Sequence, residues 1–326
     1  ANALDDKTKY PRDEIERLWK LVLLNQFHDV LPGSSITEVY KDAERYYAEV
    51  LKSADELLKD ALATVHGGGS GGSRARVESS GESVKGLRVF NSLSWPRRDV
   101  LPDGKHWIEI DAMAVGHVVD KPLPEGITPV IARSDAGSSS WILENQFLHA
   151  RISSTGRLVS LLHKPTGREC ISGQAGNTFV IFDDVSLFWD AWDTEITHLG
   201  KRLTVENAAQ ISLVDVTPLR AVLSVSLQLT ATSHLRQRIV LSAFSERLDF
   251  VTHVNWDENR KFLKVEFPTT VFPLNGMATF DTQFGFLQRP AHRNTSWDQA
   301  KFEVCAHKWA DVSDFGFGVA LLNDCK

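Results

Sequence analysis

Two short segments of the chain carry side chains whose types and spacing could do chemistry. In the first, His28 and Asp29 follow an apolar stretch of helical spacing and precede Pro32 and Gly33, which favour a sharp turn. Neutral imidazole is a good ligand for zinc-like divalent metals, and the neighbouring carboxylate could hold a second ligand or bond a sugar hydroxyl. A structural role stays open, because the helix dipole favours histidine at a helix C-terminus and aspartate readily bonds turn amides.

The remaining ligands of such a metal are not evident in the sequence. A zinc site needs three or four protein ligands, and the chain has no HxH, HxD or HExxH pattern that would supply them. His28 alone therefore does not predict a complete metal site.

The second segment contains two Trp-Asp pairs, Trp189-Asp190 and Trp192-Asp193. Aromatic faces stack on the apolar side of a pyranose and carboxylates bond its hydroxyls, so this pattern could form a sugar subsite. The alternative is a corner of a β-sandwich, with the tryptophans in the core and the acids exposed on a turn. The residues alone do not decide between the two.

The sequence pattern around these segments changes from helical to strand-like near residue 66. Before it, apolar residues recur at helical spacing in two stretches separated by Leu31-Pro32-Gly33, which predicts a helical hairpin that needs a third helix or a sheet beside it. From Leu87 onward, short alternating runs bounded by turn residues predict antiparallel strands. These runs include WILENQFLHARIS, TFVIF, RAVLSVSLQLTAT, RQRIVLS, RLDFVTHVNW and KFLKVEFPTTV.

We therefore predict an α+β multidomain protein: a helical hairpin that is part of a three-helix bundle, followed by mainly antiparallel β-sandwich domains. The predicted boundaries are 1–66 for the helical portion, 67–86 for a flexible Gly/Ser linker, 87–139 for a small β-sandwich and 140–326 for a large one. The linker is either a natural glycine run or an engineered replacement of a loop. The chain begins without Met and ends directly after a strand-like run, so we expect it to be a piece of a longer protein whose last sandwich is truncated.

Composition narrows the classes of partner. Thirty-six basic and forty-two acidic residues give a formal charge of −6, and the lysines and arginines form no stripe, which argues against nucleic acid. No apolar run approaches the ~20 residues needed to span a bilayer, and the start has no signal-peptide pattern, so we expect no membrane association. Three scattered cysteines favour a reducing compartment.

The first segment closely resembles a known family. The run LWKLVLLNQFHDVLPGSSITEVY resembles the helical domain of family 38 glycoside hydrolases, the class II α-mannosidases, and in particular their cytosolic and vacuolar branch. In the same order follow five further segments that resemble that branch: VFNSLSWPRRDVL, FDDVSLFWDAWDTEITHL, KFLKVEFP, FGFLQRPAHRNTSWDQAKFEV and FGFGVALLNDCK. The resemblance covers nearly the whole chain apart from the linker and residues 103–138.

The resemblance implies a three-part enzyme, of which this chain corresponds to two parts. An N-terminal α/β barrel would carry the nucleophile and the acid/base carboxylate, so no catalytic residue is expected here. By resemblance, His28 is a ligand of the divalent metal, Zn²⁺ or alternatively Co²⁺, and Asp29 bonds mannose hydroxyls. The residues implied to reach over the same pocket are Trp189, Asp190, Trp192 and Asp193.

We accordingly expect the non-barrel portion of a retaining, metal-dependent α-mannosidase that acts on oligomannose glycans in the cytoplasm or vacuole. Its expected partners are a mannose-containing oligosaccharide and the barrel portion of the same enzyme, and the β region could also form homo-oligomer contacts. Alone, the chain is expected to be inactive. The alternative is a stand-alone carbohydrate-binding β-sandwich module.

Overall fold

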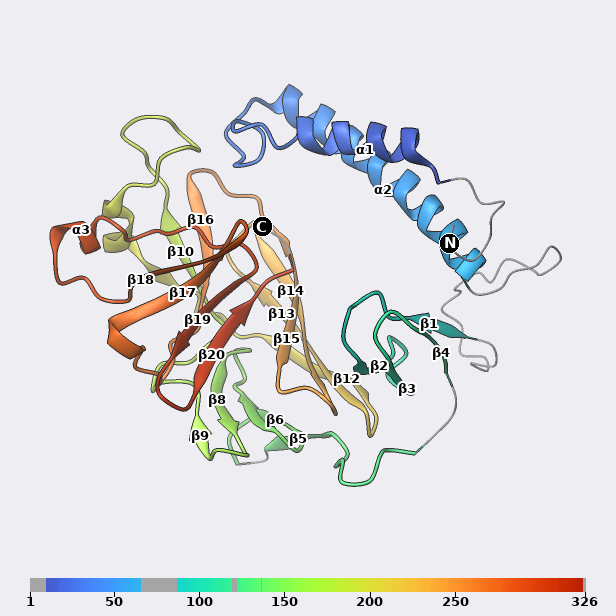
Figure 1. The fold of residues 1–326 in the computed structure, drawn as a ribbon. Coiled ribbons are helices and arrows are strands. Elements are labelled where there is room, and N and C mark those ends of the chain that lie inside the picture. The colour runs from blue at the N-terminus through green and yellow to red at the C-terminus, as the bar shows by residue number, and fades with distance from the viewer. Residues whose placement is uncertain (1–9, 66–86, 119–121, 136, 325–326) are drawn as a thin grey trace. The chain divides into compact units, whose positions relative to one another are not determined.

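The computed structural model describes residues 10–65, 87–118, 122–135 and 137–324. The predicted linker at 67–86 lies outside the described residues. The chain forms two compact units: the first extends to Pro122 and includes Ser186–Thr194, and the second comprises Leu123–Val185 and Glu195–Lys326. The predicted fold class is confirmed, since a helical hairpin precedes a series of antiparallel sheets (Figure 1).

In the first unit, helices α1 (Arg12–Leu24) and α2 (Thr37–Val65) form the hairpin. Both are amphipathic, and α1 carries acidic residues in its first turn, where the helix dipole favours them. Leu18 of α1 and Ala43 of α2 are buried, and Arg17 bonds Glu49 across the hairpin. Large apolar side chains of both helices remain exposed, among them Trp19, Leu51 and Leu58.

The first unit also holds two small antiparallel ladders. Strand β1 (Arg88–Phe90) pairs with β4 (Val115–His117), and β2 (Arg97–Val100) pairs with β3 (Trp107–Ile110). Their shared apolar cluster consists of Leu101, Ile108, Ile110 and Val118.

The second unit contains four antiparallel sheets within the described residues. Their strand orders are β5-β6-β7-β8-β9, β11-β10-β16, β12-β13-β14-β15 and β18-β17-β19-β20. The strands are β5 (Ile131–Asp135), β6 (Ser140–Glu144), β7 (Leu148–Ile152), β8 (Leu158–His163), β9 (Arg168–Glu169), β10 (Thr178–Asp183), β11 (Leu203–Thr204), β12 (Gln210–Val216), β13 (Arg220–Gln228), β14 (His234–Ser242), β15 (Leu248–Asn255), β16 (Lys261–Glu266), β17 (Met277–Thr282), β18 (Gly285–Pro290), β19 (Trp309–Ser313) and β20 (Gly318–Leu322). Short helical turns are η1 (Ile196–Lys201), η2 (Leu274–Gly276) and α3 (Ser296–Gln299).

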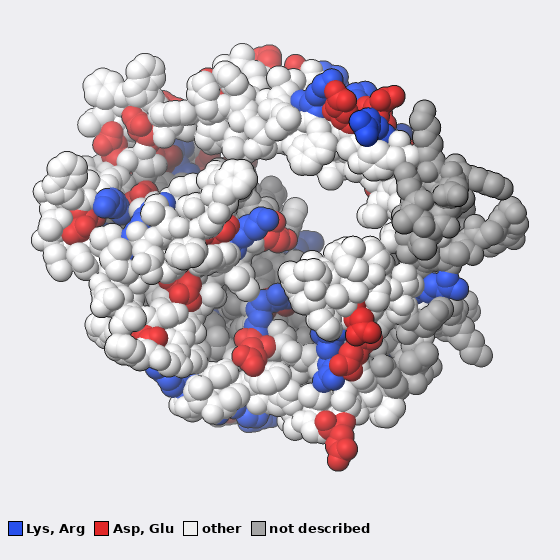
Figure 2. Space-filling view, viewed as in Figure 1, with Lys and Arg blue, Asp and Glu red and all other residues white. Residues whose placement is uncertain are grey.

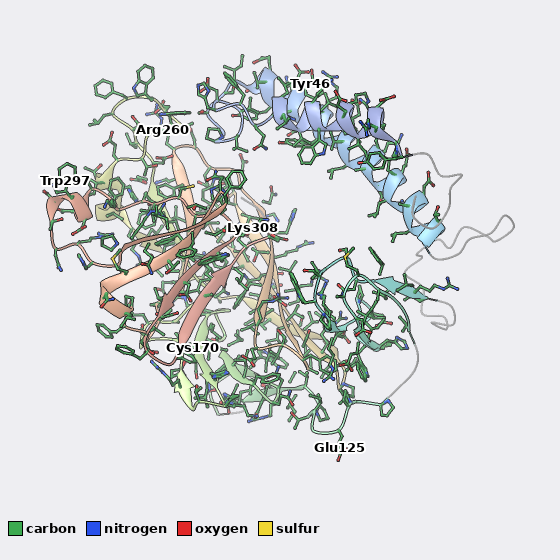
Figure 3. The ribbon with its side chains drawn as sticks, viewed as in Figure 1. Tyr46, Glu125, Cys170, Arg260, Trp297 and Lys308 are labelled. Carbon is green, nitrogen blue, oxygen red and sulfur yellow. The ribbon has the colours of Figure 1, made fainter. Side chains whose placement is uncertain are left out.

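One hydrophobic core cluster of the second unit lies between two of these sheets. Five of the six residues of β10 are buried, so its apolar run is covered on both faces, whereas β14 alternates buried and exposed positions as expected for a strand covered on one face. Phe179 and Ile181 of β10 pack with Leu227 and Leu235 from the neighbouring sheet. Cys170 is also buried in this unit (Figure 3), and both Cys170 and Cys305 are free thiols.

Charges on the described surface are mixed in sign. Figure 2 shows blue and red side chains next to one another on the helical hairpin, where ion pairs such as Arg17–Glu14 and Lys20–Glu16 form. Among the described helices, none is long and apolar enough to cross a membrane.

Asn145 interrupts an apolar run that we expected to be a single strand-like segment. Its side chain is 1% exposed and makes four hydrogen bonds. The amide nitrogen donates to the carbonyl oxygens of Ser242 and Ser245, each at 2.8 Å. The amide oxygen accepts the backbone N–H groups of Phe147 and Leu148, each at 2.8 Å. Asn145 therefore both turns the chain between β6 and β7 and ties this hairpin to the end of β14.

We predict that Asn145→Ala lowers the free energy of unfolding of the second unit by about 3 kcal/mol, because it leaves several buried backbone groups without partners. Chemical denaturation of the chain, followed by far-UV circular dichroism, measures this. The matched control is Asn207→Ala, which removes one exposed hydrogen bond to Gln228 and should cost less than about 1 kcal/mol. Equal losses for the two variants would contradict the role given to Asn145.

Candidate functional site

The corner between α1 and α2 presents His28 and Asp29. Backbone hydrogen bonds wind the chain tightly here, including Val30 N–H and Leu31 N–H to the carbonyl oxygen of Phe27 at 2.9 and 3.0 Å. Gly33 then adopts a φ of +86°, which glycine tolerates without steric cost.

Tyr40, in the first turns of α2, holds this corner. Its hydroxyl donates to the carbonyl oxygen of Asp29 at 3.2 Å and accepts the backbone N–H of Ser35 at 2.8 Å. A single phenol thereby bridges the two sides of the turn, and the backbone of Asp29 is fixed.

The side chains of His28 and Asp29 are open to solvent. They are 71% and 50% exposed, and His28 Nε2 lies 3.6 Å from Asp29 Oδ2. The imidazole packs against Phe27, with ring centroids 4.4 Å apart. Within the described residues no hydrogen bond joins the imidazole to the end of α1, so its nitrogens remain accessible to a ligand.

The segment Ser186–Thr194, here called the tryptophan loop, carries the second predicted group. Trp189 and Ala191 have φ values of +58° and +62°, and the N–H groups of Trp192 and Asp193 both donate to the Trp189 carbonyl oxygen, at 2.9 and 3.1 Å. The Ser186 hydroxyl donates to the Asp193 carbonyl oxygen at 2.7 Å, which closes the loop. Trp189 and Trp192 are 74% and 51% exposed, so neither is a core residue.

The corner and the tryptophan loop, both in the first unit, line one cavity of about 280 Å³. His28 lies beside it, with its ring centroid 6.3 Å from that of Trp192 in an edge-to-face arrangement of 80°. Of the predicted sugar-contact residues, Asp193 is not among those lining the cavity, and its backbone instead closes the loop. The lining residues are Asp29, Ser34, Trp189, Asp190 and Trp192.

This lining is suited to a polyhydroxylated ligand. Two carboxylates and a serine hydroxyl offer hydrogen-bond acceptors and one donor, and two exposed indoles offer flat apolar faces. Such a mixture of rigid aromatic surface and a few polar groups is typical of sites that bind small ligands by shape and by hydrogen bonds.

The donor set fits a divalent metal only in part. One imidazole and one carboxylate supply at most two ligands, whereas zinc takes four. The described residues contain no group of three or more His, Cys, Asp or Glu side chains able to hold a metal ion. His28 and Asp29 are therefore suited to complete a coordination sphere, and further ligands would have to come from elsewhere.

Asp183, which precedes the tryptophan loop, is held as a carboxylate. Lys261 donates a hydrogen bond to it, and together with Lys201 it lowers the pKa of Asp183 below the ordinary value. A carboxyl kept ionised in this way is a poor proton donor, so Asp183 is unsuited to the role of general acid.

Ser34 and Tyr40 were not singled out from the sequence. Ser34 lines the cavity directly after Gly33, and the Pro-Gly turn before it was the only available signal. Tyr40 fits the apolar stripe of α2, and nothing in that periodicity indicates that its hydroxyl bonds the corner.

Two family models match the chain. Residues 1–65 match the alpha mannosidase middle domain, and residues 143–326 match the glycosyl hydrolases family 38 C-terminal domain.

Among curated proteins, the chain is 39% identical over 328 residues to Alpha-mannosidase 2C1 of Homo sapiens, covering 97% of this chain and 30% of that protein. It is 32% identical to Alpha-mannosidase of Saccharomyces cerevisiae, covering 98% of this chain and 28% of the relative. The chain thus spans about 30% of the length of the human relative.

Solved structures agree at the level of the fold. The crystal structure of an alpha-mannosidase from Enterococcus faecalis matches with a TM-score of 0.69 at 16% identity, covering 97% of this chain and 45% of the other. A family 38 protein from the same organism matches with a TM-score of 0.69 at 14% identity, covering 99% of this chain and 47% of the other. The resemblance recognised in the sequence is confirmed, and the chain belongs to glycosyl hydrolase family 38.

Proposed function

We propose that the chain is the helical and β-sheet portion of a retaining, metal-dependent α-mannosidase acting on oligomannose glycans in the cytoplasm or vacuole. In this proposal it supplies one metal ligand and several sugar contacts to a pocket completed by an N-terminal α/β barrel. The observation that carries the proposal is that Asp29, Trp189 and Trp192, distant in sequence, line one cavity beside His28.

Each residue then has a chemical task. His28 would hold the metal, Zn²⁺ or alternatively Co²⁺, through an imidazole nitrogen, and Asp29 would accept hydrogen bonds from mannose hydroxyls. A bound divalent ion would chelate sugar hydroxyls and favour distortion of the ring toward an oxocarbenium-like transition state. Trp189 and Trp192 stack on the sugar and exclude water from one face.

The nucleophile and the acid/base are assigned to the barrel and not to this chain. Retaining hydrolysis needs two carboxyl groups about 5–5.5 Å apart across the glycosidic bond. Asp29 and Asp190 are assigned to hydroxyl binding, and Asp183 is ion-paired with Lys261. The chain alone is therefore expected to be inactive.

An aryl α-mannoside assay of the chain with Zn²⁺ or Co²⁺ tests whether the catalytic carboxylates lie outside this chain. We expect no turnover above the buffer rate. Appreciable turnover that His28→Ala abolishes would contradict it, because the catalytic groups would then lie within the chain. Calorimetric binding of mannose to the chain that a chelator does not affect would instead favour the carbohydrate-binding module.

In the full enzyme, His28→Ala should lower metal affinity at least about tenfold, because one nitrogen ligand is lost. Metal content after dialysis against a graded chelator series measures this. His253→Ala is the matched control, since His253 is an exposed histidine of β15 in the second unit. Unchanged metal content in the His28 variant would argue against the ligand role.

Asp29→Asn should reduce kcat/KM of the full enzyme about a hundredfold, mainly through kcat, because a charged acceptor strengthens its hydrogen bonds as charge develops on the sugar. Steady-state kinetics on an aryl α-mannoside measures both constants. Asp193→Asn provides the comparison, because Asp193 does not line the cavity, and its loss should be much smaller. An equal loss in the two variants would refute the distinction.

Trp192→Ala should raise KM about tenfold with a smaller change in kcat, because a stacking surface present in both ground and transition states is removed. Trp297→Ala is the control: Trp297 is 81% exposed on α3 and does not line the cavity (Figure 3). A larger effect of Trp297 than of Trp192 would show that the sugar platform lies elsewhere.

A further inference from the structure

One hydroxyl group in the cavity has no task in the function proposed above. Ser34 directly follows Gly33 at the corner, and its half-buried side chain lines the cavity together with that of Asp29. The hydroxyl of Ser34 can donate a hydrogen bond, whereas the ionised carboxylate of Asp29 can only accept. Ser34 therefore offers a ligand a donor on the same turn as an expected sugar contact.

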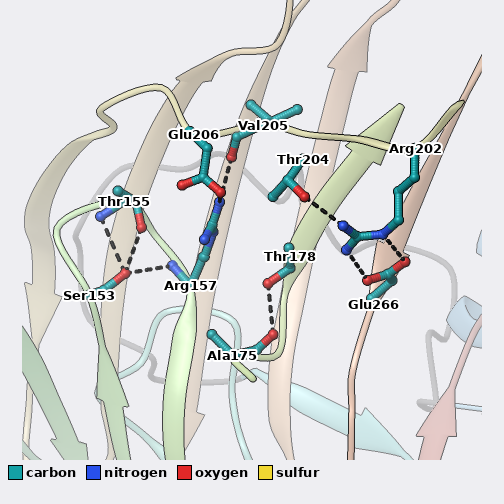
Figure 4. Close-up of polar contacts among 10 residues, drawn as sticks. All are labelled: Ser153, Thr155, Arg157, Ala175, Thr178, Arg202, Thr204, Val205, Glu206 and Glu266. Atoms are coloured by element: carbon teal, nitrogen blue, oxygen red, sulfur yellow. Dashed lines mark hydrogen bonds and ion pairs between the residues drawn. The ribbon is translucent and has the colours of Figure 1, made fainter. Parts of the chain in front are cut away.

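The protein itself makes little use of this hydroxyl. Ser34 Oγ lies 3.5 Å from the carbonyl oxygen of Asp29, which is at the outer limit for a hydrogen bond. For comparison, the bonded hydroxyl oxygens of Ser153 and Thr155 in the second unit are 2.8 Å apart (Figure 4). The Ser34 hydroxyl can therefore turn toward a ligand without giving up a strong contact.

Tyr40 already satisfies the carbonyl oxygen that Ser34 approaches. The Tyr40 hydroxyl donates to the Asp29 carbonyl oxygen at 3.2 Å, so this acceptor keeps a partner when Ser34 turns away. Losing the Ser34 hydroxyl would thus leave no backbone acceptor at the corner unpaired. The stability of the turn gains little from Ser34, which separates a role in ligand binding from a role in the fold.

The backbone of Ser34 is held on both sides. The N–H of Gly33 donates to the Val30 carbonyl oxygen at 3.2 Å, and the N–H of Ser35 donates to the Tyr40 hydroxyl at 2.8 Å. A short side chain on a fixed backbone loses little conformational freedom when it binds a ligand. The hydroxyl is therefore preorganised to face the cavity that it lines.

We propose that Ser34 is a specificity-determining residue of this cavity, and that its hydroxyl donates to the oxygen of a mannose hydroxyl whose hydrogen is accepted by Asp29. A sugar hydroxyl bound in this way is both acceptor and donor, and each hydrogen bond strengthens the other. A sugar without that hydroxyl leaves the two side chains without their partner and is rejected. The inference rests on the proposed function, because it requires mannose in this cavity.

Steady-state kinetics of the full enzyme on an aryl α-mannoside provide the first test. Ser34→Ala should lower kcat/KM about tenfold, because one hydrogen bond to the sugar is lost. Ser34→Thr keeps the hydroxyl and should stay within about threefold of the wild type. Ser94→Ala is the matched control and should change nothing, since Ser94 is an exposed serine of the same unit that does not line the cavity. An unchanged kcat/KM in Ser34→Ala would overturn the proposal.

A panel of aryl α-mannosides, each with one hydroxyl replaced by hydrogen, separates a sugar contact from a structural effect. Ser34→Ala and Asp29→Asn should lose most of their effect on the same analogue, the one that lacks the shared hydroxyl. On the other analogues the loss of about tenfold in Ser34→Ala should persist. An equal loss on every analogue would overturn the proposal, because a side chain that only supports the turn gives that result. Loss of the two effects on different analogues would overturn it as well.

Metal content after dialysis against a graded chelator series gives a readout that does not depend on turnover. Ser34→Ala should keep the metal affinity of the wild type, because its hydroxyl is assigned to the sugar. A tenfold lower affinity would overturn the proposal by making Ser34 part of the metal site. Failure of the proposed function gives a different result, since the wild-type enzyme would then not hydrolyse the parent mannoside and both proposals would fall.

Discussion

The phenol of Tyr40 is the contact on which the candidate site depends. A turn between two helices leaves backbone groups without helical partners, and here one hydroxyl satisfies groups on both sides of the turn, at Asp29 and Ser35. Because the backbone is fixed by α2, the side chains of His28 and Asp29 need not support the fold, and both remain largely exposed. A polar group that is exposed on a rigid backbone is well placed to bind a ligand.

Much of the fold could be predicted because it follows from periodicity. Apolar residues at helical spacing in α1 and α2 bury Leu18 and Ala43, and the alternation of β14 matches its one covered face. Asn145 shows where periodicity fails. It lies within an apolar run, and only the four hydrogen bonds of its buried amide reveal that the chain turns there. This turn depends on hydrogen bonds to Ser242 and Ser245, about a hundred positions further along the chain, and a local sequence pattern cannot reveal such contacts.

The candidate site, like the fold, could be predicted from the sequence only in part. The corner and the tryptophan loop were each recognisable from their own residue types. Only the three-dimensional structure shows that they line one cavity. Ser34 lines the cavity and Asp193 does not. The spacing of residues in the sequence could not predict either result, because both depend on the conformation of a tight turn.

Two features of the helical hairpin fit a further protein portion packed against it: the His28–Asp29 pair offers too few ligands for a metal, and several large apolar side chains are exposed. An imidazole and a carboxylate that are 71% and 50% exposed cannot hold a zinc ion tightly by themselves. On the same unit Trp19, Leu51 and Leu58 are more than half exposed, and covering them would be favourable in water. A covering portion that supplied ligands and buried these side chains would remove both deficits at once. In the proposed function this covering portion is the α/β barrel of the same enzyme, and the chain is expected to bind sugar poorly without it.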